Sequence, residues 1–175
     1  MRQSVHWALL IGWAVSMLVA LLLHGQRQIS EFDPDGVLLH ASTSPHFDSN
    51  FVAFLKEQNV EAGSIVHIGT ASNCYCNSLT KPHQTQLLNR FENEQYQLTS
   101  INIESAAMLK KMLSSVPALV IVDKDYQLRY LGPYATGYGC FTGKDMVEQV
   151  VTYTKQTPYQ GAVINADAQG CFCQT

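Results

Sequence analysis

The stretch that decides the fold is Ser64-Ile65-Val66-His67-Ile68-Gly69, followed four residues later by Cys74-Tyr75-Cys76. The first segment is a short apolar run that ends at glycine, which is typical of a buried strand. A helical pattern starts near Asn77, so the two thiols lie where a strand ends and a helix begins. Free N–H groups at a helix start favour thiolate over thiol. This C-x-C motif is therefore a candidate redox or metal site.

Outward from this motif, apolar runs alternate with stretches of helical spacing. Proline, glycine and aspartate separate them, and Asp123-Lys124-Asp125-Tyr126 is a hairpin turn. The pattern predicts the order β-α-β-α-β-α-β-β-α, which corresponds to an α/β fold with a mixed sheet and helices on both faces. The predicted strands are residues 37–40, 65–69, 98–103, 118–122 and 127–131. The predicted helices start near residues 44, 77, 106 and 143.

The N-terminus carries a run without charge, residues 7–23, which begins with Trp7 and ends with Leu23. As a helix it spans roughly 25 Å, enough to cross a bilayer. Arg2 precedes the run and acidic residues follow Arg27, which predicts a cytoplasmic N-terminus and an external C-terminal domain. A cleaved signal peptide is the alternative. We expect an anchor at 1–25, a linker at 26–36, a domain at 37–156 and a tail at 157–175.

The composition of the chain limits the classes of function and partner that it favours. Only 14% of the residues are charged and the net charge is -3, with no basic cluster larger than Lys110-Lys111, so nucleic acid is not an expected partner. The chain has five cysteines, an odd number, so at least one thiol is left over, pairs between chains or takes part in exchange. In an oxidising compartment disulfides form and persist. A bond within a C-x-C motif closes a small, strained ring, which favours labile chemistry.

The cysteine motif after a strand, Val116-Pro117 before a later strand and the hairpin that follows resemble the thioredoxin-like superfamily over about residues 37–155. Residues 72–77 and 116–134 resemble more narrowly an uncharacterised proteobacterial family of membrane-anchored thioredoxin-like proteins. The resemblance implies a thioredoxin-like mixed sheet flanked by helices, with Pro117 in the cis form against the cysteine motif. It departs from ordinary thioredoxins because the motif is C-x-C and Asn73 precedes it.

The resemblance and the topology together suggest roles for the cysteines. Cys74 is the expected attacking thiolate and Cys76 the resolving thiol, with Pro117 beside them where a peptide can pair as an added strand. Cys140, in the loop after the hairpin, is expected near Cys74. The tail motif Cys171-Phe172-Cys173 is either a mobile redox shuttle, a second pair of metal ligands or a disulfide that ties the tail down.

We therefore expect a single-pass inner-membrane protein with a periplasmic thiol-disulfide oxidoreductase domain, no cofactor, and protein thiols or disulfides as partners. The first alternative is a copper(I) chaperone or other metal-binding module, because soft thiolates select copper(I) or zinc. Its ligands would be Cys74, Cys76 and Cys140, with His83 or the tail as a fourth. The second alternative is a thioredoxin-like domain that binds a partner without catalysis. His67 is expected to be a core histidine or, alternatively, a proton-transfer group.

Overall fold

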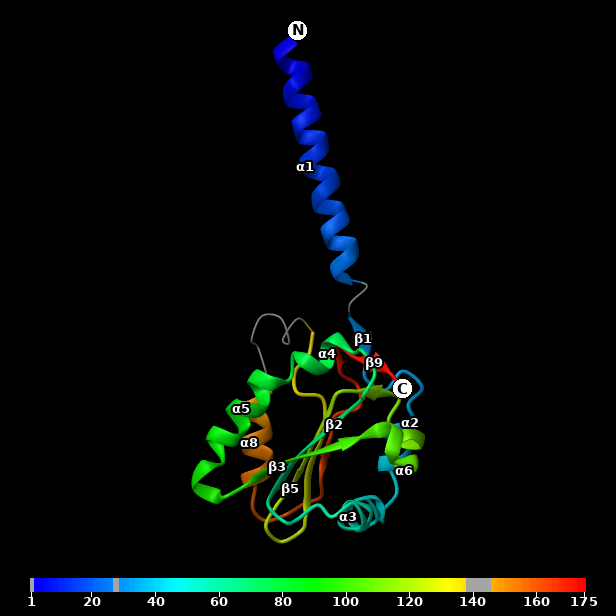
Figure 1. Ribbon diagram of the computed structural model, residues 1–175, viewed down its shortest axis with the longest axis vertical. Coiled ribbons are helices and arrows are strands. Elements are labelled where there is room, and N and C mark those ends of the chain that lie inside the picture. Colours follow the sequence, from blue (N-terminus) through cyan, green and yellow to red (C-terminus); the bar gives the residue numbers. More distant parts are fainter. Residues whose placement is uncertain (1, 27–28, 138–145) are drawn as a thin grey trace.

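The centre of the molecule is a five-stranded mixed sheet, seen in a computed structural model that describes residues 2–26, 29–137 and 146–175 (Figure 1). The strand order is β3-β2-β5-β6-β7. Strand β2 runs parallel to β3 and antiparallel to β5, β6 is antiparallel to β5, and β7 is parallel to β6. The strands are β2 (Ser64–Gly69), β3 (Gln97–Asn102), β5 (Ala118–Val122), β6 (Leu128–Gly132) and β7 (Val163–Ile164).

Each face of this sheet has its own hydrophobic core, because the central strands are buried on both sides. Ile65 packs in one core and its neighbour Val66 in the other, as the alternation of side chains along a strand requires. Helices α5 (Lys81–Arg90) and α8 (Val147–Lys155) cover the first face. Helices α2 (Val37–Ser42), α3 (Phe47–Glu57) and α6 (Ala107–Met112) cover the second. The predicted α/β class with helices on both faces is confirmed.

The first predicted strand, residues 37–40, is wrong: this segment is helix α2. Leu38 is buried, whereas Val37 and Leu39 are exposed, and the backbone N–H of Leu39 donates to the Asp33 carboxylate at 2.8 Å. A run of three apolar residues carries no period that separates strand from helix. The place of a further edge strand is taken instead by β7, which comes from the segment predicted to be a tail.

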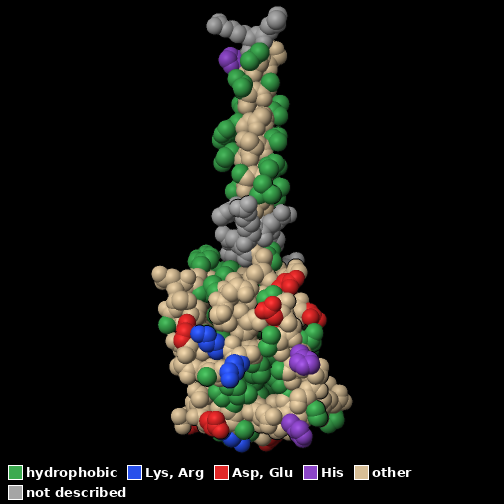
Figure 2. Space-filling view, turned by 90° about the vertical axis from the view of Figure 1, so that its right-hand side faces the viewer, with side chains coloured by type: hydrophobic (Ala, Val, Ile, Leu, Met, Phe, Trp, Pro, Cys, Tyr) green, Lys and Arg blue, Asp and Glu red, His purple; other side chains and the backbone are tan. Residues whose placement is uncertain are grey.

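Helix α1 (Arg2–Gln26) stands apart from the sheet (Figure 1). Its segment Ser4–Leu23 is 20 residues long, has a mean hydropathy of 2.1 and buries none of its surface in the protein. Figure 2 shows hydrophobic side chains along its length, while the charged side chains in that view lie on the domain. The chain therefore has one N-terminal helix long and apolar enough to span a membrane.

The remaining strands hold the segment after α1 and the C-terminal segment against the domain. Strand β1 (Ser30–Glu31) pairs with β8 (Gln169–Gly170), and β4 (Ser115–Val116) pairs with β9 (Cys173–Gln174), both antiparallel. Phe32, in the segment predicted to be a linker, is 1% exposed and lies in the core. Short helices complete the fold: α4 (Tyr75–Ser78), η1 (Glu92–Glu94) and η2 (Ile103–Ser105).

Candidate functional site: two facing C-x-C motifs

The first C-x-C motif opens helix α4, directly after the loop that follows β2. Cys74 is the N-cap residue, with an extended backbone (φ -104°, ψ 108°), and Cys76 lies inside the helix. The sequence predicted a helix from near Asn77 to about residue 94 that Pro82 starts or kinks, and in the structure α4 has only four residues. The chain then starts α5, with Pro82 in its first turn, as proline's fixed φ and missing N–H allow. The dipole beside Cys74 is therefore that of a single helical turn.

Hydrogen bonds from the central strand position this motif. The His67 Nε2 lies 3.0 Å from Asn77 Oδ1, and Nδ1 lies 3.0 Å from the Tyr134 hydroxyl. Because the amide oxygen can only accept, Nε2 donates to Asn77, and Nδ1 accepts from Tyr134. Burial lowers the pKa of His67 below its ordinary value of 6.5, so the neutral imidazole is the favoured form. His67 thus links the sheet to the residue next to Cys76.

Gly69 leaves room for this link. A Cβ at this position would lie 2.6 Å from Asn77 Oδ1 and 2.7 Å from His67 Nε2, both inside van der Waals contact. These residues also line a cavity of about 340 Å³ at the ends of the parallel strands β2 and β3. A side chain here would separate the imidazole from the amide, so glycine is what allows the two strands' ends and α4 to meet.

The loop between β2 and the motif is held from the side of β3. Thr70 Oγ1 donates to Glu104 Oε1, and the backbone N–H of Ala71 donates to Glu104 Oε2 at 3.4 Å. The hydrogen bond from Thr70 lowers the pKa of the exposed Glu104 carboxyl. The loop before Cys74 is therefore fixed by contacts with η2, which directly follows β3.

The second C-x-C motif lies on an added strand beside the first. In β9, Cys173 is opposite Val116 and Gln174 is opposite Ser115. The pairing continues past the strand, because the backbone N–H of Thr175 donates to the Ser114 carbonyl at 3.1 Å. This segment was predicted to be a tail, either mobile or tied down. In the structure it is tied down.

Two disulfides join the motifs. Cys74 is bonded to Cys173 with Cα atoms 6.1 Å apart, and Cys76 is bonded to Cys171 with Cα atoms 5.4 Å apart. The partners are 99 and 95 residues apart in the sequence. Cys173 lies in β9 and Cys171 lies at the bend just before it, and both sulfurs face the first motif. The two motifs are therefore joined by two adjacent disulfides.

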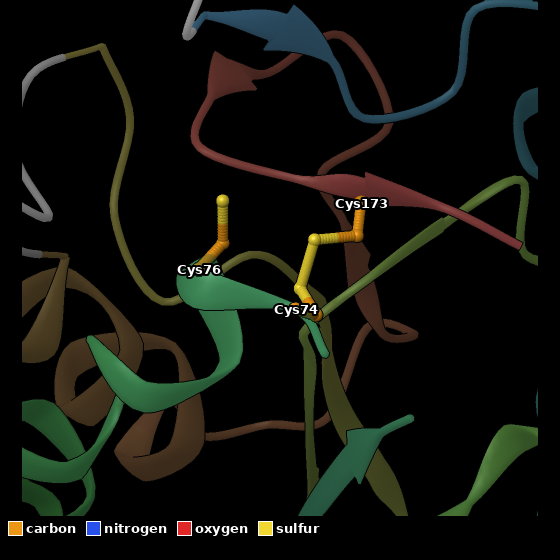
Figure 3. A group of neighbouring side chains, drawn as sticks. All are labelled: Cys74, Cys76 and Cys173. Atoms are coloured by element: carbon orange, nitrogen blue, oxygen red, sulfur yellow. A yellow bond between two sulfur atoms is a disulfide. The ribbon is translucent and has the colours of Figure 1, made fainter. Parts of the chain in front are cut away.

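The sulfur atoms form a compact cluster (Figure 3). The Sγ atoms of Cys74, Cys76 and Cys173 all lie within 4.8 Å of one another, and Figure 3 shows Cys76 beside the bond that joins the other two. Cys74 and Cys76 are 9% and 8% exposed, Cys171 is 2% exposed, and Cys173 is only partly buried. Thiolates at such distances can exchange disulfides or share a soft metal ion. The cysteine pairs and this cluster fit a redox or metal-binding role.

The other predicted site residues have different positions. The Val116–Pro117 peptide is cis, as expected, and Pro117 directly follows β4, the strand that pairs with β9. His83 lies on α5, buried at 3% exposure, with its ring centroid 6.5 Å from that of Tyr134, and is not a member of the sulfur cluster. Cys140 lies outside the described residues, so its expected proximity to Cys74 stays a prediction.

Sequence reasoning missed the residues that hold the first motif, Asn77, Gly69 and Tyr134, and it left the disulfide partners open. One signal could have indicated the partners. The two motifs share the same one-residue spacing, and two antiparallel segments with matched spacing can form two bonds at once. The hydrogen bonds of His67 had no comparable signal, because they depend on side-chain directions in the folded sheet.

The comparisons with curated proteins and with solved structures found no match. A family described as a domain of unknown function, DUF6436, matches residues 43–175. The match begins beyond helix α1 and includes both C-x-C motifs, the sheet and the C-terminal strand. Because it spans well over half of the sequence, the chain belongs to the DUF6436 family.

Proposed function

We propose that this protein is a membrane-anchored thiol-disulfide oxidoreductase of the thioredoxin-like superfamily. The observation that carries the proposal is the sulfur cluster: Cys76 lies within 4.8 Å of both sulfurs of the Cys74–Cys173 disulfide. A purely structural cross-link needs one bond between two segments, whereas this site brings exchangeable sulfurs together at the edge of a rigid sheet.

In the proposed reaction, two equivalents of an external dithiol first reduce the Cys74–Cys173 and Cys76–Cys171 bonds, so that the four cysteines become thiols and the dithiol leaves as a disulfide. The Cys74 thiolate then attacks a disulfide of a substrate protein, and a mixed disulfide forms while the substrate's other sulfur leaves as a thiolate. Cys76 attacks Cys74 Sγ, forming Cys74–Cys76 and releasing the reduced substrate. A disulfide needs about 2.05 Å between sulfurs, so the 4.8 Å limit leaves less than about 3 Å to close. The same steps in reverse oxidise a substrate dithiol.

The anchor supports substrates close to a membrane. Helix α1 ends at Gln26 and β1 begins at Ser30, a gap that an extended chain spans in at most about 15 Å. Strand β1 pairs with β8, next to Cys171, so the cysteine site lies on the side of the domain where the anchor joins it (Figure 1). We infer an inner-membrane anchor with the domain in the periplasm, where protein thiols and disulfides near the bilayer are the partners.

The test uses the full chain in detergent, with Cys140→Ser in all samples so that only the four paired cysteines are followed. After reduction with dithiothreitol and its removal, we expect Cys74 to be alkylated at pH 7 before the other thiols. With a model peptide disulfide, Cys76→Ser should accumulate a mixed disulfide at Cys74. The matched control, Cys74→Ser, should accumulate none. An unreactive Cys74 at neutral pH, with no mixed disulfide in Cys76→Ser, would contradict the proposal.

A second function, copper(I) binding, is favoured by the same three converging sulfurs. Once the disulfides are reduced, the sulfurs of Cys74, Cys76 and Cys173 offer a soft ligand set. Cys173 belongs to the tail, which was one of the two expected sources of a further ligand, while Cys140 lies outside the described residues. Metal analysis of protein purified without oxygen, together with a free-thiol count, separates the two functions. Stoichiometric copper with protected thiols supports the metal site, whereas a metal-free protein with a reversible two-electron titration supports the oxidoreductase.

A further inference from the structure

The C-terminal strand pairs with β4 in a separate two-stranded sheet, in the way that an extended polypeptide ligand would. Strand β9 adds to β4 by backbone pairing, and the Thr175 hydroxyl also donates to the Leu113 carbonyl at 2.9 Å. Backbone hydrogen bonds of this kind give affinity for an extended chain, while alternate side chains give specificity. The edge in front of Pro117 is therefore already filled by the chain's own end.

Alternate side chains of the C-terminal segment make different contacts. Phe172 points away from the sulfurs into the core, where its ring packs edge-on against Phe32 with centroids 5.1 Å apart. Its carbonyl accepts a hydrogen bond from the Ser30 hydroxyl at 3.3 Å. Cys171 and Cys173 face the first motif and are both bonded to it. One aromatic side chain thus anchors the strand, and two cysteines present it to Cys74 and Cys76.

We propose that the C-terminal segment 169–175 is a built-in substrate, whose cysteines accept two electrons from an external dithiol and leave the oxidising disulfide on Cys74–Cys76. This proposal rests on the proposed function, and it adds the identity of one exchange partner: the chain's own second C-x-C motif. The Cys74–Cys173 bond then corresponds to the mixed disulfide between an oxidoreductase and its substrate.

The exposure of the sulfurs sets the order of the steps. Cys173 is less buried than Cys171, so one thiolate of the external dithiol attacks Cys173 Sγ. The Cys74–Cys173 bond breaks and Cys74 leaves as a thiolate. The second thiol of the external dithiol then attacks the new mixed disulfide, so that the dithiol departs as a disulfide and Cys173 is left as a thiol.

The freed Cys74 thiolate lies within 4.8 Å of Cys76 Sγ. It attacks that sulfur, the Cys76–Cys171 bond breaks, and Cys171 leaves as a thiolate that takes up a proton. The products are the Cys74–Cys76 disulfide and two tail thiols. In sum, one external dithiol is oxidised, two protein disulfides become one, and two electrons and two protons reside on Cys171 and Cys173. The reduced segment then keeps its non-covalent contacts: the backbone pairing, the hydrogen bonds of Thr175 and Ser30, and the packing of Phe172.

The experiment is disulfide mapping of the full chain in detergent, with Cys140→Ser, after one molar equivalent of dithiothreitol. Free thiols are alkylated under acid quench and the bonds are assigned by mass spectrometry. We expect the major once-reduced species to contain Cys74–Cys76, with Cys171 and Cys173 alkylated. The matched control, Cys74→Ser/Cys173→Ser, lacks the internal attacking thiolate. It should keep most of its Cys76–Cys171 bond under the same treatment, although it receives the same equivalent of reductant.

The outcomes separate this inference from the function on which it rests. A once-reduced protein that retains Cys76–Cys171, with Cys74 and Cys173 alkylated, overturns the built-in substrate and leaves the oxidoreductase intact. Loss of Cys76–Cys171 in the control variant to the same extent also overturns it, because external thiols then open that bond directly. If neither bond accepts electrons in the folded protein, both proposals fail.

Discussion

The two C-x-C motifs have the same spacing and share both disulfides, yet the fold holds them by different means. Cys74 and Cys76 follow the central strand β2, and hydrogen bonds from His67 and Glu104 fix their surroundings. Of the second motif only Cys173 lies in a strand, the two-residue β9, and Cys171 precedes that strand. The first motif is therefore positioned by the central part of the fold, whereas the second motif is held in large part by its disulfides to the first.

The largest expected effect comes from removing both bonds between the motifs. In the chain-entropy model, a bond that closes a loop of about 100 residues stabilises by about 4.7 kcal/mol. With one bond in place, the second closes only a short ring and adds about 2 kcal/mol. We expect Cys76→Ser/Cys171→Ser to cost about 2 kcal/mol, and replacement of all four cysteines roughly 5 to 7 kcal/mol. Urea unfolding followed by circular dichroism in detergent measures both.

The second double variant, Cys74→Ser/Cys173→Ser, is the internal control for this prediction. It should resemble the first pair within about 1 kcal/mol, because each variant retains one long-range bond. The contrary outcome is that one double variant lowers the free energy of unfolding as much as replacement of all four cysteines. In that case the two bonds do not share one loop, and the two adjacent disulfides are not what ties the C-terminal strand to the rest of the domain.

The next effect concerns the non-covalent anchor of the second motif. Phe172 is 9% exposed and packs against Phe32. Phe172→Ala should cost about 3 kcal/mol, the lower part of the range for buried aromatic truncations. Phe172→Leu, which keeps most of the volume, should cost less than about 1.5 kcal/mol. Equal losses in the two variants, measured by urea unfolding of the oxidised protein, would show that the disulfides alone hold this strand.

A smaller effect tests the contacts that position the first motif. Gly69→Ala forces a Cβ to within 2.7 Å of both His67 Nε2 and Asn77 Oδ1, and overpacking of this kind costs about 1 to 3 kcal/mol. In an Asn77→Ala background the same change should cost less, because one of the two clashing groups is gone. Thermal unfolding of the four proteins completes this double-mutant cycle. Full additivity would contradict the contact between Gly69 and Asn77.

The smallest effect is a pH dependence from His67. Burial lowers its folded-state pKa below 6.5, so below that pH the unfolded chain binds a proton that the folded protein does not. The resulting stability is fully present above pH 6.5 and is lost as the pH falls towards the folded pKa, by at most about 1.4 kcal/mol per pH unit.

His67→Gln should remove this dependence between pH 7.5 and 5. Free energies of unfolding from urea titrations at a series of pH values provide the comparison. An unchanged slope in His67→Gln would mean that another group governs the acid sensitivity, and the buried imidazole would lose its role as the link between β2 and the first motif.

Much of the fold could be predicted because local patterns were strong. The apolar run ending at Gly69, the fully apolar strand after Pro117 and the helical stripes all appear in the sheet and its covering helices. Residues 37–40 could not be assigned, since a short apolar run fits either element and the choice depended on Asp33 and the burial of Leu38. Of the site, Cys74, Cys76 and Pro117 were placed, but their neighbours were not.

The sequence by itself determined the apolar N-terminal helix, the α/β class and the position of Cys74-x-Cys76 after a strand. The length and periodicity of apolar runs and the residues that break them are local properties of the sequence. Only the tertiary structure decided that Cys74 meets Cys173 and Cys76 meets Cys171, residues 99 and 95 positions apart. Pairing of β9 with β4 places Cys173 beside Cys74, and the bend before β9 places Cys171 beside Cys76. No local pattern contains that distance.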